Sequence, residues 1–153
     1  MAHSDPQTLE ENKAVVRRWF EEVLSQGHMD VMDMICTECA PQTVMMKGVI
    51  PNAPGGMEGA RQMIRDFRSA FSDLHFIPED QVAEGDRVVT LLTVEGTNDG
   101  PFLGIPATGK HMRISGMSMW RVVDGHLIDE TVSWDMLGAL QQLGLAPALP
   151  TGA

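Results

Sequence analysis

The sequence contains no tyrosine and only 2 cysteines, and basic residues are scarce, with 11 lysines and arginines against 21 aspartates and glutamates. The formal charge of −10 would repel the phosphates of nucleic acids and anionic membrane surfaces, so we expect neither as a partner. No apolar run reaches the roughly 18 residues of a membrane span, and no secretory signal is visible. We therefore expect a cytoplasmic protein.

Motifs of the common cofactor and metal sites are also missing. No phosphate loop or nucleophile elbow is present, and the 5 histidines lack the H-x-H and H-E-x-x-H spacings of zinc sites. Cys36 and Cys39 form a C-x-x-C pair, which occurs in redox centres and as half of a zinc site. Because a second pair is absent and Cys36 closes a predicted helix, we interpret both as incidental thiols. The sequence predicts neither a metal nor a cofactor.

Length and composition fit one folded domain. The chain has 153 residues, of which 43% are hydrophobic, as is usual for a globular protein. We place the domain at residues 1–145 and expect residues 146–153 to form a flexible C-terminal tail. The first half of the domain is helical by pattern, and the second half has the pattern of a sheet.

Apolar residues at three- and four-residue spacing predict three helices in the first half. They are expected from Pro6 to a stop at 26–28, at 29–36 and at 57–71. Asp5 can cap the first helix, in which Thr8 and Glu11 have the spacing of a capping box. A strand with β-branched character is expected at 43–49, between the second and third helices.

From Leu74 onward the hydrophobic period changes to two, which predicts strands. We place them near 75–84, 87–97, 110–123 and 126–134, followed by a short amphipathic helix at 136–143. Asp124-Gly125 indicates a tight hairpin, and Pro78 indicates an edge strand or a bulge. The nearly continuous apolar run 88–94 is typical of a central strand covered on both faces.

This order of elements predicts an α+β fold. The three helices of the first half are expected to pack on one face of a curved, mixed or antiparallel sheet, with the short helix at the C-terminal end. A curved sheet covered by helices leaves a cavity between the two layers. If the protein is an enzyme, a lone carboxylate in this apolar cavity is the simplest source of chemistry.

Four segments resemble the SnoaL-like polyketide cyclase family of the NTF2-like superfamily. They are Val16-Arg17-Arg18-Trp19-Phe20-Glu21-Glu22-Val23, the segment 79–88, the loop Gly100-Pro101-Phe102-Leu103-Gly104-Ile105-Pro106-Ala107-Thr108-Gly109-Lys110, and the closing segment Asp135 to Gly144. The resemblance covers about residues 12–145 and implies the cone-shaped NTF2-like fold. It also implies that copies pair through the outer face of the sheet, so we expect a homodimer.

The resemblance implies cofactor-independent cyclisation of an apolar small-molecule substrate by intramolecular aldol condensation, with Asp135 as the general acid and base. Apolar surroundings disfavour the ionised form of a carboxyl group and raise its pKa towards neutrality, where one group can both take and return a proton. The residues expected to bind the substrate are Trp19, Met45, Met46, Ser118, Trp120, Trp134 and His111. The polar partners that such cyclases carry opposite the aspartate are missing, because Gly116 and Ser118 occupy the corresponding positions.

Several alternatives stay open at this stage. Aspartate directly before an amphipathic helix is a preferred N-cap, and hydrogen bonds from helix amides would lower the pKa of Asp135 and make it a poorer base. The same acid could serve epoxide opening or cyclisation, isomerisation or dehydration of a polyketide or terpenoid. A non-catalytic module that binds a small molecule is equally compatible with so apolar a pocket. The lack of tyrosine separates the chain from ketosteroid isomerase and scytalone dehydratase, whose fold it resembles.

Overall fold

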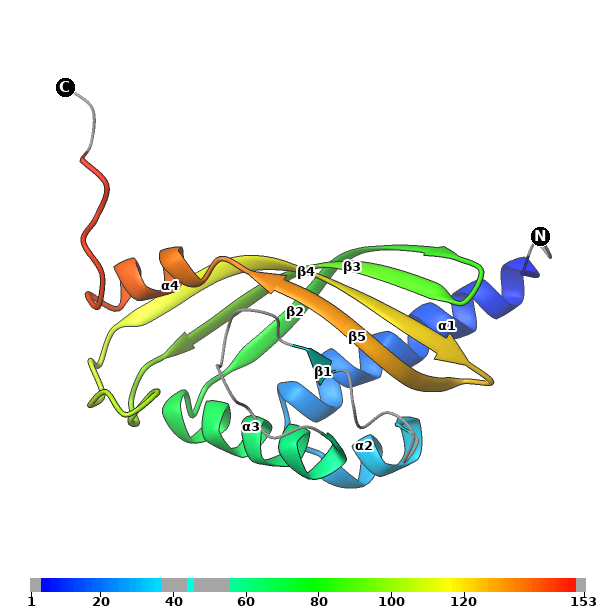
Figure 1. Cartoon of the computed structure of the whole chain (residues 1–153), viewed down its shortest axis with the longest axis horizontal. Helices are drawn as coiled ribbons and strands as arrows, with labels where there is room; N and C mark the ends of the chain where they lie inside the picture. The colour runs from blue at the N-terminus through cyan, green and yellow to red at the C-terminus, as the bar shows by residue number, and fades with distance from the viewer. Residues whose placement is uncertain (1–3, 37–43, 46–55, 151–153) are drawn as a thin grey trace.

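The architecture is a curved sheet with helices on one face, as Figure 1 shows for the computed structural model. The model describes residues 4–36, 44–45 and 56–150. Four antiparallel strands follow one another as β2 (His75–Glu84), β3 (Arg87–Thr97), β4 (His111–Val123) and β5 (His126–Trp134). The short β1 (Val44–Met45) pairs in parallel with β5, so the sheet order is β1-β5-β4-β3-β2. The predicted α+β fold with a mixed sheet is confirmed.

The helices of the first half lie together below the sheet in Figure 1. They are α1 (Pro6–Arg18), the π-helical turn η1 (Trp19–Leu24), α2 (Met29–Ile35) and α3 (Gly56–Ala70). The last helix, α4 (Met136–Gln142), follows β5 at one end of the sheet and contacts β4. All the predicted helices are therefore present, and the part of the predicted strand 43–49 that the structure describes is β1.

The start of α1 confirms one prediction and corrects another. Asp5 occupies the N-cap position and Pro6 the first turn, but the Asp5 side chain makes no capping hydrogen bond. Thr8 lies inside the helix, so the predicted capping box with Glu11 is wrong. Instead, Gln7 Nε2 donates to Glu11 Oε1 at 2.9 Å across one helical turn.

A widened turn continues α1 where the sequence pattern predicts an ordinary helix. In η1 the backbone N–H of Ser25 donates to the carbonyl oxygen of Phe20, five residues earlier, at 3.1 Å. Such π-helical turns rotate the following side chains relative to a regular helix. Trp19 and Leu24, at the two ends of η1, both line the cavity below the sheet.

The strand predictions are confirmed in most details. β2 is an edge strand whose register shifts between Pro78 and Asp80, as the proline indicates. Asp124 and Gly125 have positive φ angles of 50° and 74°, which suit a tight hairpin. β3 is central, but the prediction that both its faces are covered is wrong for the single chain, since Leu91 on the outer face is 39% exposed.

The loop that carries the family signature is fixed by Asn98. Its side-chain amide donates to the carbonyl oxygens of Ala70 and Gly100 at 3.2 and 2.9 Å, and its oxygen accepts from Thr108 N and Oγ1, both at 2.9 Å. These bonds tie the loop to the end of α3. As a result, Phe102 packs edge-to-face against Phe71, with the ring centres 5.4 Å apart.

Across the ranges that the structure describes, no helix combines the length and the apolar character needed to cross a membrane.

Gly116 is required by the close approach of β4 and β5, and replacing it with alanine should destabilise the fold. Gly116 pairs with Trp134, and an added Cβ would lie 2.1 Å from Trp134 Cε3. Overpacking of this kind costs about 1–3 kcal/mol of unfolding free energy, measurable by urea denaturation. Ser115→Ala, at an exposed neighbouring position, is the control. Equal stability of the Gly116→Ala variant and the wild type would contradict the packing described here.

Candidate functional site

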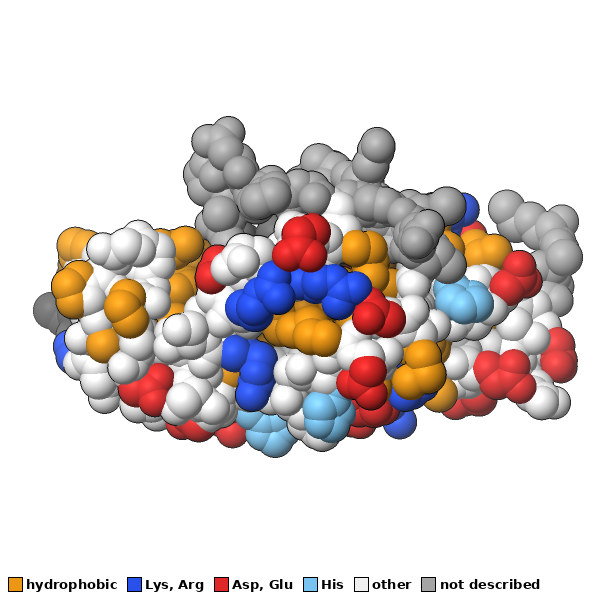
Figure 2. All heavy atoms as spheres, turned by 90° about the horizontal axis from the view of Figure 1, so that it is seen from below, with side chains coloured by type: hydrophobic (Ala, Val, Ile, Leu, Met, Phe, Trp, Pro, Cys, Tyr) orange, Lys and Arg blue, Asp and Glu red, His pale blue; other side chains and the backbone are white. Residues whose placement is uncertain are grey.

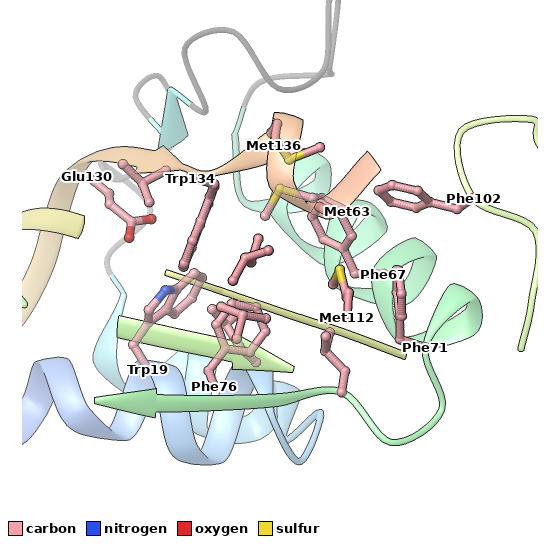
Figure 3. Close-up of a pocket in the computed structure, with 16 residues that line it drawn as sticks. Trp19, Met63, Phe67, Phe71, Phe76, Phe102, Met112, Glu130, Trp134 and Met136 are labelled. Atoms are coloured by element: carbon pink, nitrogen blue, oxygen red, sulfur yellow. The ribbon is translucent and has the colours of Figure 1, made fainter. Parts of the chain in front are cut away.

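An apolar cavity with a volume of about 70 Å³ lies between the inner face of the sheet and the helices below it. Figure 3 shows Trp19 and Glu130 towards one end and Phe71 and Phe102 towards the other. The lining residues are Trp19, Leu24, Met63, Phe67, Phe71, Leu74, Phe76, Val94, Phe102, Met112, Ile114, Glu130, Val132, Trp134, Met136 and Ala139. Glu130 is the one ionisable side chain among them.

Glu130 reaches the cavity because of its place in β5. Side chains alternate between the two faces of a strand, so Glu130 shares the inner face with Val132 and Trp134. Glu130 is directly opposite Trp120 of β4 and is only 5% exposed. Within residues 4–36, 44–45 and 56–150, its carboxyl group takes part in no ion pair.

Burial raises the pKa of the Glu130 carboxyl group to about 8, because the apolar surroundings disfavour its charge. The donor groups of the neighbouring Ser118 and Trp120 side chains favour the ionised form and thereby lower this pKa. The group therefore titrates near neutral pH, where a carboxyl group can act as a base when ionised and as an acid when protonated.

Three buried donors near Glu130 have no hydrogen-bond partner among the described residues. They are Trp19 Nε1, Ser118 Oγ and Trp120 Nε1. The rings of Trp19 and Trp120 contact each other edge-to-face, with their centres 5.2 Å apart. Figure 3 shows the nitrogen edge of Trp19 turned to the end of the cavity where Glu130 lies. Buried polar groups without partners are rare in folded proteins, so this cluster is a marked departure from ordinary packing.

Asp135 does not lie where the sequence analysis expects it. The residue is exposed, and its Oδ1 accepts a hydrogen bond from the backbone N–H of Gly138 at 2.9 Å as the N-cap of α4. The expectation that its carboxylate is buried is wrong, because β5 ends at Trp134 and the chain turns towards the amides of the next helix. The N-cap interpretation is confirmed, and the catalytic role of Asp135 stays a prediction.

The structure distributes the other predicted site residues over several environments. Trp19 and Trp134 line the cavity, whereas Ser118 and Trp120 are buried beside Glu130 and are not part of the lining. His111 is exposed at the start of β4, with its Nδ1 atom 3.3 Å from Thr97 Oγ1. The side chain of Met45 and the whole of Met46 lie outside the described residues.

The buried acid of the cavity wall that the sequence analysis missed is Glu130. Its signal was present in the alternation of β5, since counting back in steps of two from Trp134 and Val132 reaches an acid on the apolar face. An acid at such a position is unusual, because glutamate is almost never fully buried without a partner.

The cysteine motif adds no reactive group in the described part of the chain. Cys36 is buried, and burial raises the pKa of its thiol to about 12, so it stays protonated at neutral pH. Cys39 lies outside the described residues. Within the residues that the structure covers, no three histidine, cysteine, aspartate or glutamate side chains gather as a metal site would require.

Comparison with known proteins identifies relatives of this architecture. The model of the SnoaL-like polyketide cyclase family matches residues 14–143. The structure of TsrD from Streptomyces laurentii is 26% identical with a TM-score of 0.74, over 93% of this chain and 98% of that one. A SnoaL-like polyketide cyclase from Jannaschia sp. CCS1 is 24% identical with a TM-score of 0.79, over 96% and 100%. IdmH from Streptomyces antibioticus is 23% identical with a TM-score of 0.74, over 87% and 98%. No curated protein sequence matches the chain.

Replacing Glu130 with glutamine should remove a pH dependence of stability. The folded-state pKa of about 8 lies above the ordinary value of 4.5, so the folded protein holds this proton more tightly than the unfolded chain. The stabilisation is complete below about pH 4.5 and is lost as the pH rises through about 8. Each unit of pKa difference corresponds to about 1.4 kcal/mol, so the loss amounts to a few kcal/mol.

The measurement is urea unfolding of wild type and Glu130→Gln at several pH values across this interval. Glu84→Gln, which removes the same charge from an exposed position at the end of β2, is the matched control and should follow the wild-type curve. If Glu130→Gln retains the wild-type slope, the carboxyl group does not titrate as a buried group.

Proposed function

Because the chain belongs to the SnoaL-like polyketide cyclase family, we propose that it catalyses the cofactor-independent cyclisation of an apolar small molecule by intramolecular aldol condensation. The observation that carries the proposal is Glu130, the single ionisable group among the described residues of the cavity wall, whose pKa burial raises to about 8. The aldol addition that closes the ring needs only proton transfers and the formation of one carbon–carbon bond, so one carboxyl group can serve each of its steps.

In the proposed reaction the Glu130 carboxylate takes a proton from a carbon between two carbonyl groups of the substrate. The resulting enolate carbon attacks a further carbonyl carbon of the same molecule, which closes the ring and leaves an alkoxide. The protonated Glu130 then returns its proton to the alkoxide and gives a hydroxyl group. Glu130 ends in its starting state, and no atom or electron is gained or lost.

The cavity supports such a reaction by its shape. Apolar walls can hold a flexible chain in one folded conformation, which replaces an improbable encounter of two reacting carbons by a prearranged one. Met63, Met112 and Met136 line the cavity, and the unbranched side chain of methionine adapts readily to the shape of a ligand. A single water molecule needs roughly 10–15 Å³ of such space, so the cavity admits a compact ligand, and a larger one requires its walls to move.

Helix α4 is the part of the cavity wall best suited to movement. Ala139 is the one residue of this helix that is fully buried, and Met136 beside it is half-buried. Gln142 at the end of α4 bonds the backbone of Arg113 at 2.7 and 3.0 Å and Leu143 after it is buried, so the first turn of the helix, where little apolar surface is packed, opens at the least cost. Outward movement of α4 would enlarge the cavity at the end away from Glu130.

Glu130 is a better candidate for the acid and base than Asp135. The Asp135 carboxylate is exposed and occupied as a helix cap, so it lacks the apolar surroundings that prompted its prediction. Glu130 has these surroundings and lines the cavity. The two residues are distinguishable by substitution, because Asp135→Asn keeps a side chain that can cap α4 and Glu130→Gln keeps the size of the buried side chain.

Exchange of a carbon-bound proton tests this choice without knowledge of the natural substrate. β-Tetralone, a compact apolar ketone with acidic C–H groups, serves as the probe, and its deuterium uptake in D₂O is followed by proton NMR. Wild type should accelerate the exchange, and Glu130→Gln should reduce the acceleration by roughly 10²–10⁴-fold, the usual contribution of general acid–base catalysis. Glu84→Gln, far from the cavity wall, should match wild type.

The same experiment separates the alternatives. Loss of exchange in Asp135→Asn with full exchange in Glu130→Gln would overturn the assignment to Glu130 and support Asp135. Binding of β-tetralone, measured by calorimetry, without any exchange by wild type would support a non-catalytic binding module. Exchange lost in Glu130→Gln and kept in Asp135→Asn supports the proposed mechanism.

We further propose that the protein is a homodimer that pairs through the outer face of the sheet. Five apolar side chains lie together on this face in neighbouring strands, namely Val82, Val89, Leu91, Met117 and Met119. Of these, Val82 and Met117 are 67% and 55% exposed. A contiguous apolar patch of this kind on a sheet is typical of a protein interface.

A second copy suits this patch because charged pairs flank it on the same sheet, with Arg113 beside Glu95 and Arg121 beside Asp129. A two-fold axis through the patch would pack the patch of one copy against the same patch of the other, as in most dimers. The opposite, helix-covered face of the molecule shows basic side chains beside acidic ones in Figure 2. Between the helices, Arg61 of α3 forms an ion pair with Asp33 of α2.

Met117→Lys should convert the dimer to a monomer, because a charge at the centre of an apolar interface loses its hydration on pairing. Leu137→Lys is the matched control, since Leu137 is also 55% exposed but belongs to α4 and not to the strands that carry the patch. Light scattering coupled to size-exclusion chromatography gives the masses. A monomeric wild type, or a Met117→Lys variant that remains dimeric, would contradict this proposal.

A further inference from the structure

The unpartnered polar atoms of the described chain are concentrated around Glu130. Four buried side-chain atoms lack a hydrogen-bond partner among the described residues, and three of them are the donors Trp19 Nε1, Ser118 Oγ and Trp120 Nε1. The fourth is the acceptor Gln81 Oε1. Packing defects at random positions would not gather donors around Glu130, the one buried acid among the described residues, so the arrangement requires a physical reason.

The strand register places two of these donors against Glu130. Trp120 is the direct partner of Glu130 across β4 and β5, and Ser118 is the partner of Val132, two residues further along the same face. Side chains directly opposite lie about 4.5–5.5 Å apart at Cβ, and diagonal neighbours about 7–8 Å, which long side chains can span. Ser118 and Trp120 are both 1% exposed and do not line the cavity. Both side chains lie close enough to the Glu130 carboxyl group to lower its pKa, so their donors are placed beside it within the sheet layer.

A carboxylate is the acceptor that such donors fit. Ionised glutamate offers two oxygens and donates nothing, whereas a serine hydroxyl and an indole N–H can each donate one hydrogen bond. Hydrogen bonds to an ionised group are shorter and stronger than those between neutral groups. The protonated carboxyl group can still accept through its carbonyl oxygen, but the donors gain a charged and therefore stronger acceptor when Glu130 ionises.

We propose that Ser118 and Trp120 are positioning residues that hydrogen-bond the ionised Glu130 side chain from the sheet side and leave its other oxygen directed into the cavity. The proposal rests on the proposed function in that Glu130 is taken as the acid and base. It changes the role first expected for Ser118 and Trp120, because they act on the carboxylate and do not touch the substrate.

No other charged group competes with these donors among the residues described around Glu130. Directly after α2, Cys36 bridges to Leu127 of β5 and stays a neutral thiol, because burial raises its pKa to about 12. From η1 the neighbour is Trp19, and from α3 and α4 the cavity wall presents Met63, Phe67, Met136 and Ala139. The protonation of Glu130 is therefore governed by burial and by the donors of β4.

Titration of Glu130 in hydrogen-bond variants tests the proposal. The carbon-13 resonance of its carboxyl group, assigned by its loss in Glu130→Gln, is followed against pH. Ser118→Ala removes a donor to the ionised form and should raise the Glu130 pKa by about one unit. Trp120→Phe, which keeps an aromatic ring beside Trp19, should raise it in the same direction.

Thr90→Val is the matched control. Thr90 is the partner of Ser118 in the strand register and is fully buried, but its hydroxyl group accepts from Gln81 Nε2 at 3.2 Å on the side away from Glu130. Thr90→Val should leave the Glu130 pKa unchanged. Ser118→Thr keeps the hydroxyl group and should restore a titration close to that of wild type.

An unchanged Glu130 pKa in both Ser118→Ala and Trp120→Phe would overturn the proposal, as would an equal shift in Thr90→Val or in Ser118→Thr. If Ser118→Ala fails to fold, Trp120→Phe and the control carry the test. The titration needs no substrate, so its outcome is separate from the proposed function. Full exchange activity in Glu130→Gln would refute the catalytic role of Glu130. The titration would still show whether Ser118 and Trp120 hydrogen-bond its carboxylate.

Discussion

The interior of this protein contains one carboxyl group, Glu130, that apolar side chains surround and no described cation balances. Removing a charge from water is among the most costly steps in folding, so such a group binds a proton at pH values where other carboxyl groups are ionised. The arrangement opposes stability, and the curved sheet has to hold the side chain in place against its tendency to reach solvent. The chemistry proposed for the cavity depends on that constraint.

Two acids near the end of β5 illustrate how position decides behaviour. Asp135 follows the last residue of the strand, where the chain turns outward, so that the backbone N–H of Gly138 donates to its carboxylate and the side chain is exposed to solvent. Glu130 lies inside the strand on the inner face, where neither is available. The two side chains differ by one methylene group, and it is their environments that make one a helix cap and the other a buried acid with a raised pKa. The donors of Ser118 and Trp120 explain how the buried acid can still ionise.

Much of the fold could be predicted from the sequence because its signals are local. The change of hydrophobic period after Leu74 located the strands, and Asp124-Gly125 and Pro78 located a hairpin and an irregular edge. The π-helical turn at Trp19 was not predictable, since its apolar spacing is close to that of an ordinary helix. The exposed outer face of β3 was also missed, because an apolar run does not reveal whether another chain covers it.

The site was predicted less well, for a physical reason. Burial of a side chain depends on strand register and on which elements cover the sheet. Neither can be predicted from the residues next to an acid in the sequence. Asp135 was chosen for its place between two apolar elements, a feature that a helix cap shares. Asp129 and Glu130 are neighbours in β5. Only the alternation of the strand relative to Trp134 shows that Glu130 points to the inner face and Asp129 to the outer face.

The central claim is that the Glu130 carboxyl group is buried without a compensating charge, and its titration in the wild-type protein tests this most directly. Carbon-13 NMR of the carboxyl resonance, with no ligand present, gives the pKa of this residue alone. The account predicts a midpoint near 8. A midpoint near the ordinary value of 4.5 would show that the group is solvated, and would contradict the account.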